Sequence, residues 1–241
     1  MIRVKGVISY DGGYFRGFQR QKSTKDTVTT QIEDALKALN IKSEIRGSGR
    51  TDAKVHASGQ VIDFEIPHYW SSTQKLQREL NRKLKKIYIK HISIVDDSFH
   101  SRFCAKRRVY RYIFKTSKPS IFEENYISYY PQFNKDRLTN TLKLFEGVHN
   151  FEYFQKSGSV VHTTIREIYT TRYIQRGDYH YIYFEANGFL RSQVRMMIDA
   201  LMLCTNRAIS IEQIKEQIDH RVKHTQTLAP PEGLYLARVI Y

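Results

Sequence analysis

The chain has 241 residues, 41% of them hydrophobic and 26% charged, which is typical of a globular protein with one large domain or two compact halves. Lys and Arg total 39 against 24 acidic residues, a formal net charge of +15. This excess is most simply explained by a polyanionic partner, because Lys and Arg gain affinity by releasing phosphate counterions. A basic protein with no nucleic-acid role is the alternative. No run of ~18 apolar residues and no signal-peptide core occur, so we expect no membrane partner.

The cysteines and histidines indicate neither disulfides nor metal binding. Cys104 and Cys204 form no CxxC pair and favour a reducing, cytoplasmic location. His220 and His224 are four residues apart, but no cysteine pair or third ligand accompanies them. We therefore predict no metal site.

In chain order, residues 2–10 predict a strand, and Asp11–Gly13 a turn. A helix follows, with Thr30 and Glu33 spaced as a capping box. Its apolar face comprises Ile32, Ala35, Leu36 and Leu39.

The stretch 45–64, IRGSGRTDAKVHASGQVIDF, is the most distinctive of the chain. A glycine-bracketed loop precedes a strand predicted for residues 60–66, and such loops place reactive groups at the surface. If Arg50 and Asp52 share this loop, the cation favours the charged form of the carboxylate, which can then serve as a base, nucleophile or ligand. A turn with a solvated ion pair is the alternative.

A second helix is predicted around Leu76, Leu80 and Leu84, followed by a strand over residues 87–94. The polar side of this helix is strongly basic. It could face a polyanion, or it could face only solvent. The cations are Lys75, Arg78, Arg82, Lys83, Lys85 and Lys86.

The second half repeats the mixture of strands and helices. In the segment 99–115 a strand would place Tyr110 and Tyr112 on one face. A helix around Leu138 and Leu142, a hairpin of strands 165–174 and 179–186, a buried helix after Gly188, a helix over 211–218 and a strand over 234–240 follow. We predict an α+β fold of two similar halves, 1–105 and 106–241, joined by a mixed, largely antiparallel sheet.

Six segments resemble motifs of the TruA family of tRNA pseudouridine synthases, and they cover essentially the whole chain in the same order. GRTDAKVHA is similar to the family's GRTDAGVHA, and the others resemble its YDGTxFxGWQxQ, FxARFxAxxRxYxY, FxGxHDFxxF, GFLxxMVR and GLxL motifs. In this chain they read YDGGYFRGFQRQ, FHSRFCAKRRVYRY, FEGVHNFEYF, NGFLRSQVRMM and PPEGLYL.

The resemblance implies roles for single residues. Asp52 matches the essential aspartate, which attacks or stabilises a species formed at the ribosyl C1′ of the target uridine. Arg50 matches the residue that orients it, and Arg195 an arginine expected to pair with it. Tyr110 matches the tyrosine that stacks on the target base and takes the C5 proton; an ordinary strand tyrosine is the alternative.

Other residues are implied to bind the substrate. Leu234 falls in the strand that lines the uracil pocket, although a core leucine would look the same in the sequence. Arg107 and Arg108 are candidate RNA contacts. Lys54 replaces the family glycine after RTDA: it is strained if this position needs a positive φ, and otherwise it can contact a phosphate. Smaller departures are Phe18 for Trp, Asn150 for Asp and Asp199 for Gly.

The resemblance further implies that the active-site cleft lies between the two halves, and it implies the reaction and its partners. The enzyme would convert uridine to pseudouridine in the tRNA anticodon stem-loop, at positions 38, 39 and 40, without cofactor or metal. It would act as a homodimer with one tRNA spanning both subunits. Another RNA, such as ribosomal RNA, and a catalytically silent RNA-binding protein are the alternatives.

Overall fold

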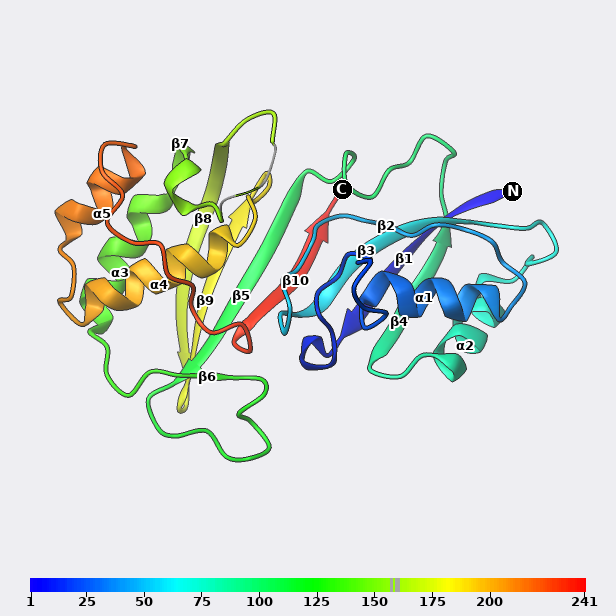
Figure 1. Cartoon of the computed structure of the whole chain (residues 1–241), viewed down its shortest axis with the longest axis horizontal. Coiled ribbons are helices and arrows are strands. Elements are labelled where there is room, and N and C mark those ends of the chain that lie inside the picture. Colours follow the sequence, from blue (N-terminus) through cyan, green and yellow to red (C-terminus); the bar gives the residue numbers. More distant parts are fainter. Residues whose placement is uncertain (157, 159–160) are drawn as a thin grey trace. The chain divides into compact units, whose positions relative to one another are not determined.

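The computed structural model describes residues 1–156, 158 and 161–241, and the chain divides into two compact units. Unit 1 comprises Met1–Lys106 and Tyr235–Tyr241, and unit 2 comprises Arg107–Leu234. Each unit combines a sheet with helices (Figure 1). Among the strand pairs described, most are antiparallel, which confirms the predicted α+β class.

Unit 1 is built on a sheet with the order β4–β1–β3–β10, and a short β2 pairs with β3. Its strands are β1 (Ile2–Tyr10), β2 (Arg46–Gly47), β3 (His56–Ile66), β4 (Ile87–Ile94) and β10 (Leu234–Ile240). β10 runs parallel to β3, with Tyr235 opposite His56. The last residues of the chain therefore complete the sheet that begins with its first residues.

The helical elements of unit 1 are η1 (Gly12–Tyr14), α1 (Val28–Lys37) and α2 (Thr73–Lys83). The predicted capping box of α1 is wrong. The helix begins three residues earlier, where the Thr27 side chain accepts a hydrogen bond from the backbone N–H of Thr30. Glu33 instead accepts a hydrogen bond from the N–H of Ile45, at 3.2 Å, a tertiary contact that local spacing does not reveal.

Unit 2 is built on a sheet with the order β5–β9–β8–β7, and a short β6 runs parallel to β5. Its strands are β5 (Arg107–Lys115), β6 (Ser128–Tyr129), β7 (Gly147–Asn150), β8 (Ile165–Arg176) and β9 (Tyr179–Ala186). Its helical elements are α3 (Lys135–Leu142), η2 (Lys143–Phe145), η3 (Glu152–Phe154), α4 (Gln193–Thr205) and α5 (Ile211–Ile218).

Helix α4 of unit 2 packs against both α3 and α5, and α3 also contacts β8 (Figure 1). Helix α4 is buried around most of its circumference, as its apolar sequence predicts. Tyr110 and Tyr112 both point into the core, which confirms the predicted face of β5. Within the described part of the chain, none of the helices has both the length and the apolar character to cross a membrane.

Candidate active site

The loop that carries Asp52 connects β2 to β3 and is held by backbone hydrogen bonds. The Thr51 carbonyl accepts from the N–H of Phe18 at 3.1 Å, and the Lys54 N–H donates to the Phe15 carbonyl at 3.3 Å. The Val55 N–H closes a turn on the Asp52 carbonyl at 3.2 Å. The segment after β1 thus holds the loop on both sides of the aspartate.

A buried pair of hydroxyl groups also holds this loop in place. The phenol of Tyr10, at the end of β1, lies 2.7 Å from the Thr51 hydroxyl. Tyr10 is 5% exposed and packs against the rings of Phe15 and Phe18. Burial raises the pKa of Tyr10 well above its usual range, so the phenol stays protonated and available as a hydrogen-bond partner.

His56, four residues after Asp52, anchors the far end of the loop. Its Nδ1 accepts a hydrogen bond from the N–H of Gly12 at 3.0 Å, and its ring stacks on Tyr235 with centroids 4.7 Å apart. Only glycine fits at position 12, because a Cβ there would lie 2.1 Å from the Val55 carbonyl oxygen. The turn after β1 and the start of β3 are therefore in direct contact.

Gln60 anchors the beginning of the loop to β3. Its side-chain oxygen accepts from the Ser48 hydroxyl at 2.6 Å, and its Nε2 donates to the Gly49 carbonyl at 2.7 Å. Gln60 is fully buried. Sequence reasoning did not single out Tyr10, Thr51, His56 or Gln60 as site residues, although all four lie in or beside the quoted motifs.

The predicted site residues of this loop differ in exposure. Asp52 is half-buried, whereas the side chains of Arg50 and Lys54 are exposed. An exposed arginine beside a half-buried carboxylate can reach both solvent and a bound phosphate. The roles predicted for Asp52 and Arg50 remain predictions.

Lys54 has a φ of 64°, in the left-handed region that favours glycine. This φ confirms the prediction that a lysine is strained at this position if the backbone needs a positive φ. The backbone must turn here so that the Lys54 N–H can reach Phe15 and the Val55 N–H can reach Asp52. A phosphate contact by its side chain stays a prediction.

Tyr110 and Arg195 both lie in unit 2. Tyr110 is 8% exposed, and its ring packs edge-on against Phe189, with centroids 5.1 Å apart. Arg195, in the first turn of α4, donates from Nε to the Ala229 carbonyl at 2.7 Å, while the Ala229 N–H donates back to the Arg195 carbonyl at 3.2 Å. The segment that precedes β10 is thereby fastened to α4.

Asp199 lies one helical turn after Arg195 and strengthens this fastening. Its carboxylate accepts a hydrogen bond from the Thr227 hydroxyl. Burial raises the pKa of Asp199, while the Thr227 hydrogen bond and the Arg195 charge act in the opposite direction. The departure from the family glycine at this position thus adds a tether to the segment that leads to Leu234.

The remaining predicted binding residues make contacts within unit 2. Arg107 forms an ion pair with Glu185 at 2.9 Å and lies 4.8 Å from the Tyr169 ring centroid. Arg108 donates to the Asn187 carbonyl at 2.7 Å. Leu234 is buried at the start of β10, as expected both for a residue that lines the uracil pocket and for an ordinary core leucine. Arg107 stays exposed, so a phosphate can still approach it.

Together, the α+β units, the aspartate loop held by buried hydrogen bonds and the excess of cations favour an enzyme that acts on RNA. A family model described as tRNA pseudouridine synthase matches residues 7–104 and 142–241. The chain belongs to this family of tRNA pseudouridine synthases. The match includes Asp52 and Arg195, whereas Tyr110 lies in the unmatched segment between the two ranges.

Full-length relatives agree with this assignment. The chain is 38% identical to a tRNA pseudouridine synthase A of Helicobacter hepaticus and 38% identical to one of Campylobacter jejuni, covering 100% of both proteins in each case. It is 37% identical to a tRNA pseudouridine synthase A of Pseudothermotoga lettingae, with 99% of each chain covered. The segment with Tyr110, Arg107 and Arg108 is included in these alignments.

Proposed function

We propose that this protein isomerises uridine to pseudouridine in the anticodon stem-loop of tRNA, at positions 38, 39 and 40. The observation that carries the proposal is the loop around Asp52, whose flanking residues are held by the hydrogen bonds of Tyr10 to Thr51, Gln60 to Gly49 and His56 to Gly12. A rigid backbone can present a carboxylate to C1′ in one orientation, which lowers the entropy cost of the reaction.

The reaction needs few participants. The bond between C1′ and N1 of the uridine breaks, the base rotates, and a bond between C1′ and C5 forms. C5 loses a proton and N1 gains one, so atoms and electrons balance without an oxidant or a co-reactant. Before this, the uridine must leave its stack, which costs a few kcal/mol and is offset by stacking on aromatic side chains.

The roles of the individual residues follow the family resemblance. Asp52 acts at C1′ and Arg50 orients it, while Tyr110 stacks on the target base and takes the C5 proton. Arg195 is the family arginine expected to pair with the aspartate. Leu234 contacts the uracil, and Lys54, Arg107 and Arg108 contact RNA phosphates. The edge-on packing of Phe189 on Tyr110 supports this role, because it limits the rotation of the tyrosine ring.

Pseudouridine mapping of total RNA from a deletion strain tests the proposal. We expect the modification to disappear at tRNA positions 38, 39 and 40 and to return on complementation with the unmutated gene. Loss in ribosomal RNA instead would overturn the tRNA target. An unchanged map would overturn the activity and favour a silent RNA-binding protein.

We also propose that the protein is a cytoplasmic homodimer and that one tRNA contacts both subunits. The tRNA substrate of the family and the two cysteines, which form no CxxC pair, support this proposal. Light scattering of the purified protein should give twice the chain mass of 28.5 kDa. A monomer at micromolar concentration that is fully active would contradict it.

A further inference from the structure

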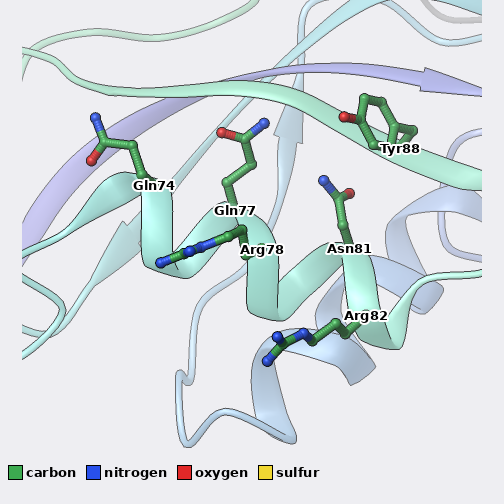
Figure 2. Close-up of a pocket in the computed structure, with 6 residues that line it drawn as sticks. All are labelled: Gln74, Gln77, Arg78, Asn81, Arg82 and Tyr88. Carbon is green, nitrogen blue, oxygen red and sulfur yellow. The ribbon is translucent and has the colours of Figure 1, made fainter.

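A groove lies between α2 and the edge strand β4 of unit 1 (Figure 2). Its volume is about 640 Å³. Two of its lining residues are cations and none is acidic. The lining comprises Gln74, Gln77, Arg78, Asn81, Arg82 and Tyr88.

The amide side chains of the groove are used to cover the edge strand. Asn81 donates to the Ile89 carbonyl at 2.9 Å and accepts from the Ile89 N–H at 2.8 Å. Gln77 donates to the carbonyls of Ile89 and Lys90, at 3.0 and 2.9 Å. Because these contacts occupy backbone groups of Ile89 and Lys90, the edge of β4 beside the groove is poorly suited to pairing with an added β-strand. They also attach α2 to β4.

The arginines of the groove are arranged differently. Gln77 and Asn81 point to the strand that bears Tyr88, whereas Arg78 and Arg82 extend along the helix rather than toward this strand and also line the groove (Figure 2). They are one helical turn apart, about 6 Å along the axis. Arg82 contacts Glu79 at 2.8 Å, but its side chain is 74% exposed, so this surface ion pair is weak and easily exchanged for a phosphate.

The cationic side of α2 continues toward the aspartate loop. Lys86 lies with its ammonium group 4.2 Å from the Tyr14 ring centroid, and its carbonyl accepts from the N–H of Asp11 at 3.0 Å. The next residue, Gly12, contacts His56. Since β1 separates β4 from β3, the groove lies about 10 Å from β3 in the sheet. No residue of the Asp52 loop lines the groove, so the groove is separate from the loop that holds Asp52.

We propose that the groove between α2 and β4 binds the phosphodiester backbone of the tRNA at a segment outside the anticodon stem-loop. This inference rests on the proposed function and adds a second contact to it. Arg78 and Arg82 bind phosphates, and Tyr88, which is 56% exposed, packs against a ribose or an unpaired base. Phosphate contacts of this kind place the substrate in register and carry no sequence information.

The test compares the affinities of two RNAs for the full-length protein. The double variant Arg78→Gln and Arg82→Gln removes two charges without creating a repulsion with Glu79. We expect its Kd for full-length tRNA to rise about tenfold, and the salt dependence of log Kd to flatten by about 1.4 to 1.8, the value for two lost phosphate contacts. The Kd for an isolated anticodon stem-loop should stay the same.

A matched control removes two exposed cations from unit 2, Lys215→Gln and Lys223→Gln, so that the loss of net charge is equal. An equal loss of tRNA affinity in this control would overturn the proposed role of the groove, because the effect would then come from the overall charge of the protein. If the double variant loses the same affinity for the isolated anticodon stem-loop, the bound RNA segment does not lie outside that arm, and this part of the proposal is overturned. Turnover of the unmutated protein on the same tRNA is measured in parallel: if no pseudouridine forms, the proposed function fails while the binding comparison still decides the groove.

Discussion

The hydroxyl groups of Tyr10 and Thr51 lie 2.7 Å apart in the core of unit 1, and each comes from a different sequence motif. Tyr10 ends β1, whereas Thr51 directly precedes the proposed catalytic aspartate. The pair connects the sheet to the loop through a buried hydrogen bond, where a lost partner costs more than the bond contributes. The position of Asp52 therefore depends on a residue 42 positions earlier in the chain.

Removal of this hydrogen bond should lower both stability and turnover. Tyr10→Phe keeps the ring and leaves the buried Thr51 hydroxyl without the phenol, so we expect the free energy of unfolding to fall by about 1 to 3 kcal/mol. We expect kcat to fall about tenfold to a hundredfold, because a small displacement of a catalytic group is costly. Urea denaturation and steady-state kinetics measure the two effects.

A double-mutant cycle checks that the effect belongs to the pair. Thr51→Val should have a similar cost, and the double variant Tyr10→Phe with Thr51→Val should be less destabilised than the sum of the single variants. Additive costs would show that the two hydroxyl groups contribute independently.

Asp52→Asn keeps the shape of the side chain but removes its charge and its nucleophilic oxygen. We expect kcat to fall by about 10⁴ or more, while the Kd for tRNA changes only a few-fold. The matched control is Asp34→Asn, an exposed carboxylate on α1 of the same unit. Turnover of Asp52→Asn comparable to that of the control would contradict the assignment of Asp52.

Lys54→Gly should stabilise the protein, because glycine adopts the φ of 64° without a Cβ penalty. We expect a gain of about 1 kcal/mol in the free energy of unfolding, measured by urea denaturation. Lys54→Ala is the control that removes the charge but keeps the Cβ. If both variants are equally stable, backbone strain at this position is not significant.

The same two variants separate strain from RNA binding. If Lys54 contacts a phosphate, both should flatten the salt dependence of log Kd for tRNA by about 0.7 to 0.9. An unchanged salt dependence in both would mean that the side chain is only solvated.

Glu123 should make the stability of unit 2 depend on pH. The Tyr179 hydroxyl donates to its carboxylate at 2.5 Å, and Ser120 donates from both its N–H and its hydroxyl at 2.9 Å. These hydrogen bonds, with that from Lys115, lower the pKa of Glu123 from 4.5 to about 2. Because the folded state favours the charged form, this contribution is complete above about pH 5 and is lost as the pH falls toward 2.

Glu123→Gln removes the titrating group. The variant should be less stable than the unmutated protein at pH 7, and this difference should shrink when urea denaturation is repeated at pH 3. Glu124→Gln, an exposed neighbour, is the control. A difference of the same size at both pH values would show that Glu123 acts through packing alone.

The sequence alone determined the elements whose signals are local. Leu76 and Leu80 mark the buried face of α2, the alternation of Tyr110 and Tyr112 gives the inner face of β5, and the glycines around Asp52 mark a loop. Hydrophobic periodicity is a property of neighbouring residues, so it can be recognised without the fold. The motifs likewise indicated the family before any geometry was known.

Only the tertiary structure decided how distant segments meet. It places Thr27 rather than Thr30 at the start of α1, brings Tyr10 to Thr51, and shows that Lys54 needs a left-handed backbone. These features depend on the register between β1 and β3 and on the path of the loop between them. Strand register and loop closure are set by the packing of the whole unit, and residues 40 or more positions apart carry no local signal of it.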